Sequence, residues 1–203
     1  MTKFVFDLDG TITTVETLPL LAAELDLSDE MKLLTDLTLS GQIPFDKSFK
    51  LRYLILRNLP LKRIQAVMES VELDGRIVDF IAAHKKNCAV VTGNLDCWIE
   101  PLAARLGCEV FSSTSELDGN LPVLTNILDK GAVIRELKRT CDRVIAVGES
   151  FNDVPMFKAA DVAIAFGGVH MPVDAAIAVA DYVIFDGGEL CRLLKTLQEA
   201  NLT

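Results

Sequence analysis

Phe4-Val5-Phe6-Asp7-Leu8-Asp9-Gly10-Thr11-Ile12 is the stretch that decides the fold of this chain. Its apolar start predicts a buried strand, and two aspartates, one residue apart, follow directly. Two carboxylates at the end of such a strand are costly unless a cation or a substrate compensates their charge. Gly10 permits a sharp turn or the close approach of a ligand, and Thr11 adds a hydroxyl. The pattern favours Mg²⁺ held by carboxylates together with a phosphorylated substrate, the alternative being a plain loop cap.

The composition predicts a globular protein with a substantial core. The chain has 203 residues, half of them apolar, which suffices for one large domain or a core with a small inserted domain. The formal net charge is −9, from 20 basic and 29 acidic residues. No basic patch is visible in the sequence, so we expect neither a nucleic acid nor an anionic membrane as partner.

The cysteines and the start of the chain predict a cytoplasmic protein. The five cysteines are scattered without Cys-x-x-Cys spacing, which is typical of free thiols in a reducing compartment. The N-terminal residues have neither the basic start nor the apolar stretch of a signal peptide, and no apolar run reaches membrane-spanning length. A monomer or homodimer is expected.

Short apolar strands alternate with amphipathic helical segments along most of the chain. This alternation predicts a doubly wound parallel sheet with helices on both faces, and ligands in such α/β folds bind beyond the carboxyl ends of the strands. The expected strands span 4–6, 89–92, 109–112, 144–147, 162–165 and 182–185, and the expected helices span 75–84, 98–106, 130–139, 153–159 and 190–200.

Residues 14–74 interrupt this alternation. They contain helical patterns at 17–25, 29–40, 45–57 and 61–70 and no convincing strand. We therefore expect an inserted helical cap at 14–74 and an α/β core made of 1–13 and 75–203. Residues 115–127, with Asp118-Gly119 at the turn, predict a small hairpin.

Three further motifs carry polar chemistry. Thr92-Gly93-Asn94 ends a strand with a hydroxyl and a glycine that can bond a phosphate oxygen. Lys130, at the start of a helix, can neutralise a phosphate, although a solvated lysine is the commoner interpretation. The segment from Glu149 to Asp153 offers a second source of metal ligands, with Asn152 as an orienting amide, or else an acidic surface loop.

The order of these motifs resembles the haloacid dehalogenase superfamily of phosphoryl-transfer enzymes, over essentially the whole chain. Within it, the motifs look most like those of phosphoserine phosphatases, including Val15-Glu16-Thr17 and the segment from Phe45 to Arg52. The resemblance implies that Glu16 and Arg52 bind the amino and carboxylate groups of the substrate. Solvated charges on helices are the alternative for these two residues.

The resemblance also implies catalytic roles. Asp7 is the expected nucleophile that forms an aspartyl-phosphate, and Asp9 the expected general acid and then base. Thr92 and Lys130 are expected to hold the phosphoryl oxygens. The expected cofactor is Mg²⁺, bound by Asp7, the backbone carbonyl of Asp9, and Glu149 or Asp153. Gly93, Asn94 and Asn152 are expected to contact the substrate.

Two positions depart from the family pattern. Glu149 stands where an aspartate is usual, next to Ser150 in place of a glycine, and Mg²⁺ demands tight octahedral geometry. Asn94 replaces a glycine common in phosphoserine phosphatases, and we expect its side chain to crowd the phosphate or the substrate amine. The histidines, His84 and His170, lie far apart without a metal-ligand partner, so we expect no catalytic role for them.

The function expected from these features is a Mg²⁺-dependent phosphomonoesterase of serine biosynthesis, with phosphoserine as first substrate. Three alternatives stay open. The first is a phosphotransferase that passes the phosphate to a small alcohol such as homoserine. The second is a phosphatase for a different small metabolite, such as a methionine-salvage or sugar phosphate. The third is a non-catalytic binding protein on the same fold.

Overall fold

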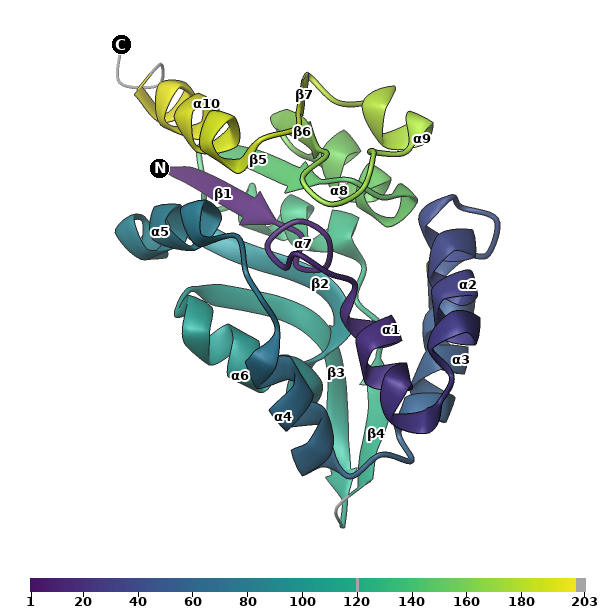
Figure 1. Ribbon diagram of the computed structural model, residues 1–203. Coiled ribbons are helices and arrows are strands. Elements are labelled where there is room, and N and C mark those ends of the chain that lie inside the picture. Colours follow the sequence, from purple (N-terminus) through teal and green to yellow (C-terminus); the bar gives the residue numbers. More distant parts are fainter. Residues whose placement is uncertain (120, 200–203) are drawn as a thin grey trace.

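The computed structural model describes residues 1–119 and 121–199 and has a seven-stranded sheet at its centre (Figure 1). The strand order is β4-β3-β2-β1-β5-β6-β7, and all neighbours are parallel except β3 and β4. The doubly wound α/β fold predicted from the sequence is thus confirmed. The strands are β1 (Thr2–Phe6), β2 (Cys88–Leu95), β3 (Glu109–Asp118), β4 (Leu121–Asn126), β5 (Arg143–Gly148), β6 (Val162–Phe166) and β7 (Tyr182–Ile184).

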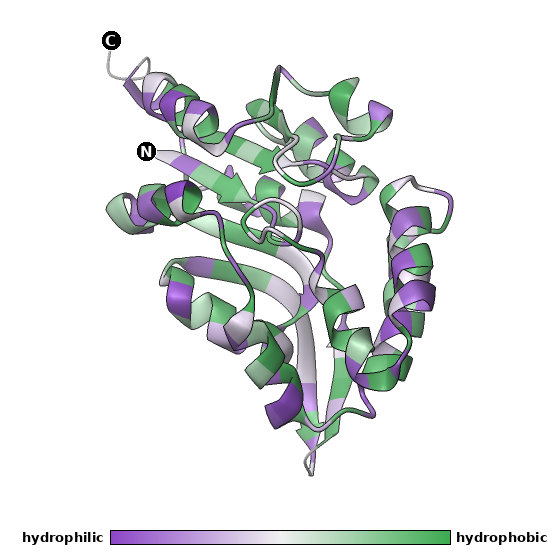
Figure 2. Ribbon diagram, in the orientation of Figure 1, coloured by the Kyte–Doolittle hydropathy of each residue, from purple (hydrophilic) through white to green (hydrophobic). Residues whose placement is uncertain are grey.

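Alternate residues of the strands belong to two apolar clusters, one on each face of the sheet. Phe4 and Phe6 of β1 pack with α5, α6 and α10, whereas Val5 packs with α7 and α8 on the opposite face. Figure 2 shows β1 turning green, the colour of apolar residues, after its polar first residues. The helices of the core are α5 (Gly75–Ala83), α6 (Asp96–Leu106), α7 (Lys130–Leu137), α8 (Val154–Ala159), α9 (Asp174–Ile177) and α10 (Gly187–Glu199).

Four helices lie between β1 and α5, where the sequence predicted a helical block. Helices α2 and α3 pack against each other beyond the ends of the strands, and α4 packs on α6 (Figure 1). Their buried residues join the same apolar cluster as Phe4 and Phe6. These helices are α1 (Thr17–Ala22), α2 (Ser28–Leu39), α3 (Phe45–Leu56) and α4 (Leu61–Ser70).

Several element boundaries differ from the sequence-based prediction. Strand β2 continues to Leu95 through an irregularity after Val91, and β3 continues to Asp118 because β4 pairs with it as an antiparallel hairpin. The short helix α9 was not predicted, nor were the 3₁₀ turns η1 (Ala23–Leu25), η2 (Lys85–Asn87) and η3 (Phe151–Asp153). Residue 120 of the predicted hairpin and residue 200 of the predicted last helix lie outside the described residues, as do residues 201–203.

The state of the cysteines and the length of the helices follow from the structure as well. All five cysteines are free, as the sequence predicted. Within the described ranges, no helix combines the length and the apolar character needed to cross a membrane.

The register of the sheet brings the polar motifs together. Phe6, the last residue of β1, pairs with Val90 of β2 on one side and Val147 of β5 on the other. The backbone N–H of Asp7 then donates to the carbonyl of Val147 at 2.9 Å. Because the three strands run parallel, the residues that follow them meet at one edge of the sheet.

Candidate active site

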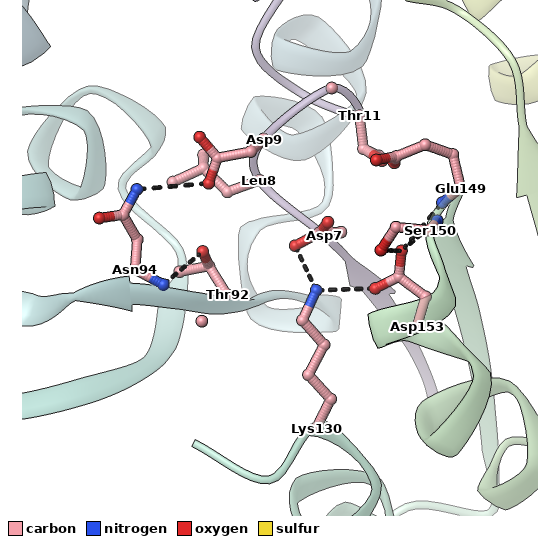
Figure 3. Close-up of polar contacts among 12 residues, drawn as sticks. Asp7, Leu8, Asp9, Thr11, Thr92, Asn94, Lys130, Glu149, Ser150 and Asp153 are labelled. Carbon is pink, nitrogen blue, oxygen red and sulfur yellow. Dashed lines mark hydrogen bonds and ion pairs between the residues drawn. The ribbon is translucent and has the colours of Figure 1, made fainter. Parts of the chain in front are cut away.

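Lys130 joins two of these segments through buried ion pairs. Its Nζ lies 2.6 Å from Asp7 Oδ1 and 2.7 Å from Asp153 Oδ1 (Figure 3). The side chain of Asp129 accepts from the N–H of Ala132 and caps α7, which fixes Lys130 at the first turn of the helix. Only 2% of the Lys130 side chain is exposed, so the interpretation as a solvated lysine is wrong.

The charges around Lys130 shift its titration and that of Asp7. Burial is the largest influence on the pKa of Asp7 and raises it well above its usual range, as does Asp153, while Lys130 acts in the opposite direction. Burial alone lowers the pKa of Lys130, but the carboxylates of Asp153 and Asp7 outweigh it and raise that pKa. Lys130 therefore stays charged and holds the two aspartates near each other.

Asp7, Glu149 and Asp153 form an acidic cluster in which one carboxylate oxygen of each lies within 4.8 Å of the others. Asp153 is fully partnered: Oδ1 pairs with Lys130, and Oδ2 accepts from the N–H of Glu149 and from the N–H and hydroxyl of Ser150. Its place behind Gly148 requires a glycine there, because an added Cβ would lie 2.6 Å from Asp153 Cγ.

Glu149 offers the open oxygen of the acidic cluster. Its Oε2 accepts from the hydroxyl of Thr11 at 2.7 Å, while its buried Oε1 has no hydrogen-bond partner among the described residues. Burial, and after it Asp153, raises the pKa of Glu149 well above its usual range. A buried, unpartnered carboxylate oxygen beside two other carboxylates fits a hard divalent cation, so the donor set is consistent with a metal site.

Asp9 points away from the acidic cluster, toward helix α1. Its Oδ1 accepts from the N–H of Thr17 at 3.1 Å and from the Thr17 hydroxyl, and its Oδ2 accepts from the side-chain amide of Asn94 at 3.3 Å (Figure 3). Asn94 also donates to the hydroxyl of Thr17 at 2.8 Å. The side chain of Asn94 is thus occupied with Asp9 and Thr17, and the Asp9 carboxylate lies apart from the acidic cluster of Asp7, Glu149 and Asp153.

Thr92 and Gly93 form the wall of the site that comes from β2. The hydroxyl of Thr92 accepts from the N–H of Asn94 at 3.1 Å, and Thr92 is buried. Gly93 lies against the ring of Phe45, the first residue of α3: a Cβ added at Gly93 would lie 2.0 Å from Phe45 Cζ. The absence of a side chain at Gly93 therefore allows α3 to approach β2.

We predict that Gly93→Ala separates α3 from β2 and lowers kcat/KM at least about tenfold for the phosphoester hydrolysis expected from the sequence, because the added Cβ overpacks the contact with Phe45 at a cost of about 1–3 kcal/mol. Steady-state phosphate release measures the effect. Gly75→Ala is the matched control, since a Cβ at Gly75 meets nothing within 4 Å. Equal activity of Gly93→Ala and Gly75→Ala would contradict the importance of the contact between Gly93 and Phe45.

Glu16 and Arg52 come from the segment between β1 and α5. Arg52 is 4% exposed, donates to the hydroxyl of Thr35 at 3.3 Å and has a buried Nε without a hydrogen-bond partner among the described residues. Glu16 follows the Asp9 loop, and its buried Oε1 also lacks such a partner. Burial lowers the pKa of Arg52 and raises that of Glu16. The interpretation of both residues as solvated helix charges is therefore wrong.

A cavity brings the expected site residues together. Its empty volume is about 480 Å³, and all the expected site residues line it except Asp153, which lies behind Glu149 and Lys130. Its lining residues are Asp7, Asp9, Glu16, Leu18, Thr35, Thr38, Leu39, Phe45, Phe49, Arg52, Thr92, Gly93, Asn94, Lys130, Glu149, Ser150 and Asn152.

Sequence reasoning missed four polar residues of this region. Thr17 donates a hydrogen bond to Asp9, and Ser150 donates one to Asp153. His170 lies 3.5 Å from Glu16. Thr11 was noted only as a hydroxyl or cap, yet it bonds Glu149. Thr11, Thr17 and Ser150 carried a signal, because all three stand inside the motifs named in the sequence, whereas His170 stands in none.

Comparison with known proteins agrees with this geometry. The sequence profile described as haloacid dehalogenase-like hydrolase matches residues 4–158. The phosphoserine phosphatase of Methanocaldococcus jannaschii is 26% identical over 175 residues, which cover 79% of this chain and 83% of that protein. The phosphoserine phosphatase of Archaeoglobus fulgidus is 27% identical over 186 residues, which cover 85% of this chain but 54% of that protein. The chain thus spans about half the length of the second relative.

Solved structures show the same fold. A structure described as a phospho-aspartyl intermediate analogue of phosphoserine phosphatase superposes with a TM-score of 0.80 at 23% identity, covering 97% of this chain and 99% of the other. The arrangement of helices and strands described above is therefore shared with a solved fold. The profile match covers most of the chain, including the segment that begins at Asp7 and the segment that ends at Asp153. It establishes that this protein belongs to the haloacid dehalogenase-like hydrolase family.

Proposed function

We propose that this protein is a Mg²⁺-dependent phosphomonoesterase that hydrolyses phosphoserine through an aspartyl-phosphate intermediate. The observation that carries the proposal is the buried Asp7–Lys130–Asp153 arrangement, which opens on a cavity that also contains unpartnered atoms of Glu16 and Arg52. Phosphoserine phosphatases among the relatives support the choice of substrate.

The proposed chemistry begins at Asp7. Its carboxylate oxygen forms a bond to phosphorus while the bond from phosphorus to the serine oxygen breaks, and Asp9 gives its proton to that leaving oxygen. A water then attacks phosphorus, Asp9 takes the proton of this water, and the bond to Asp7 breaks to release inorganic phosphate. Asp9 suits both steps because Thr17 and Asn94 hold its carboxylate at the cavity wall.

Other residues of the chain hold the phosphoryl group. We propose that Lys130 and Thr92 contact its oxygens, and that the N–H groups around Gly93 and Asn94, with the amide of Asn152, complete this subsite. Magnesium, bound by Asp7, the carbonyl of Asp9 and Glu149, would offset negative charge on the phosphoryl oxygens. Glu149 is the better candidate than Asp153 for an open ligand, because both oxygens of Asp153 already have partners.

The helices between β1 and α5 supply the amino-acid end of the site in this proposal. Residues 14–74 would form a cap that excludes water and admits only small substrates, above a core made of 1–13 and 75–203. Arg52 would bind the carboxylate of phosphoserine through its free Nε, and Glu16 would bind the ammonium group.

Phosphate release from a panel of small phosphoesters tests the proposal. We expect hydrolysis of L-phosphoserine that needs Mg²⁺ and stops with a chelator. Activity on other phosphoesters alone would retain the chemistry and discard the amino-acid site. Formation of a phosphorylated alcohol on addition of homoserine would indicate a phosphotransferase, and no release from any compound would favour a binding protein.

We predict that Arg52→Ala lowers kcat/KM for phosphoserine about 10- to 100-fold and changes that for an aryl phosphate less than about threefold, because a hydrogen bond to a charged group contributes about 1.5–3 kcal/mol. Steady-state kinetics on the two substrates measure this difference. Arg57→Ala is the control, since Arg57 follows the same helix and lies over Tyr53 instead. Equal losses on both substrates would argue against a carboxylate contact.

A further inference from the structure

His170 reaches the amino-acid end of the cavity from a different part of the fold. It stands in the loop between β6 and α9, and its Nε2 lies 3.5 Å from Oε1 of Glu16. This loop is held at both ends: the N–H of Gly167 donates to the carbonyl of Ile184, and the N–H of Val173 donates to the carbonyl of Glu149. The backbone of the core thus presents His170 to Glu16.

The contact is an ion pair between a buried and a half-exposed group. The side chain of Glu16 is 16% exposed and that of His170 is 44% exposed. Their separation is too long for a good hydrogen bond, which agrees with Glu16 Oε1 having no such partner among the described residues. When protonated, the imidazole therefore neutralises Glu16 and leaves Glu16 Oε1 free to accept a hydrogen bond, and solvent can reach the imidazole.

Carboxylates outnumber cations around this pair. Asp9 and Arg52 act on Glu16, and Asp36 and Lys32 of helix α2 act on His170. The carboxylates of Glu16 and Glu149 also converge on Gly10, where an added Cβ would lie 3.1 Å from an oxygen of each. A buried carboxylate in such surroundings is costly without a paired cation, because an unpaired buried charge is strongly destabilising.

We propose that His170 is a specificity-determining residue, whose imidazolium pairs with Glu16 and is displaced by the ammonium group of the substrate. This inference rests on the proposed hydrolysis of a phosphorylated amino acid. Exchange of one cation for another keeps Glu16 paired throughout, whereas an uncharged group that displaced His170 would leave the carboxylate unpaired. The pair thus selects for an amine over a hydroxyl at the same place.

The exchange also links substrate binding to a proton. The pKa of His170 is raised, above all by the nearby carboxylate of Glu16, and displacement by an ammonium group would lower it again. Below the raised pKa the imidazolium competes with the substrate for Glu16, and above it the neutral ring does not compete. The KM for phosphoserine is therefore expected to fall as the pH rises through the pKa of His170.

The imidazole signals of His170 give a direct test by NMR. The chain has 2 histidines, so the signal that is missing in His170→Gln identifies the residue. We expect Glu16→Gln to lower the titration midpoint of His170 toward about 6.5. In Asp7→Asn, which does not consume substrate, L-phosphoserine should lower this midpoint, and a phosphorylated hydroxy acid without the amine should not. An unchanged midpoint in either experiment overturns the proposal.

Kinetics on His170→Gln supply the second measurement. Between about pH 6 and about pH 8 we expect the wild-type KM for phosphoserine to fall about threefold more than that of the variant, with kcat alike. The phosphorylated hydroxy acid should show no such difference, and His84→Gln, whose ring stacks on Phe80, should behave as wild type. Equal pH dependence in both proteins overturns the proposal. If phosphoserine shifts the titration midpoint of His170 but the wild-type protein releases no phosphate, the proposed function is refuted and the proposal for His170 stands.

Discussion

Asp7→Asn is expected to lower the rate of phosphate release from phosphoserine at least about 10³-fold, because the variant keeps the shape of the side chain and loses the nucleophile. The substituted side chain would still follow β1 and lie beside Lys130, so binding of substrate should persist while chemistry stops. Steady-state phosphate release measures the loss. Acid-quenched samples with labelled substrate should contain phosphorylated wild-type protein and unlabelled variant.

Two controls separate this result from simple unfolding. Asp46→Asn removes a carboxylate that is half-exposed and pairs only loosely with Lys47 at 3.9 Å, so its activity should equal that of wild type. Thermal unfolding of Asp7→Asn should stay close to that of wild type, because the substitution removes one of three clustered carboxylates while Lys130 keeps its pair with Asp153. Activity within about tenfold of wild type would exclude Asp7 as the nucleophile.

The sequence predicted the sheet because its signals are local. Continuous apolar runs such as that of β5 must be buried on both faces, and strands that alternate with helices must run parallel. The same rules predicted that the Asp7 and Thr92 motifs would meet. The exception, β4, is antiparallel because a short hairpin joins it to β3.

The contacts within the site depend on packing between distant segments, which no local pattern describes. The Lys130 motif by itself favoured a solvated lysine, and only the order of the motifs gave it a phosphate-binding role. The packing of α7 against β2 and α8 shows that two buried carboxylates surround it. The side-chain amide of Asn94 turns to Asp9 and Thr17, two contacts that no local pattern indicated. No sequence motif marked His170, because its contact with Glu16 joins two segments that are far apart in the chain.

Lys130→Met should therefore affect both stability and activity. The variant leaves Asp7 and Asp153 buried without their cation, and breaking a buried pair costs about 3–5 kcal/mol. Without metal, we expect a lower Tm, and phosphatase activity measured with Mg²⁺ should fall at least about 100-fold, or about 2.7 kcal/mol. The pKa of Asp7 is raised in the folded state, so this carboxyl stabilises the fold less as the pH rises above the pKa of an unfolded aspartate, about 4. We therefore expect the difference in Tm between wild type and Lys130→Met to grow above about pH 4.

Magnesium distinguishes this electrostatic cause from a loss of packing. A cation bound beside Asp7 and Glu149 would replace part of the missing charge, so Mg²⁺ should raise the Tm of Lys130→Met more than that of wild type. Lys138→Met is the matched control, because Lys138 pairs with Asp161 where both side chains are about a third exposed, and its removal should cost less than about 1 kcal/mol. Thermal melts of the three proteins, with Mg²⁺ and with chelator, measure these differences. Equal Mg²⁺ shifts in wild type and Lys130→Met would mean that Lys130 and the cation act on separate charges, which would contradict a shared acidic cluster.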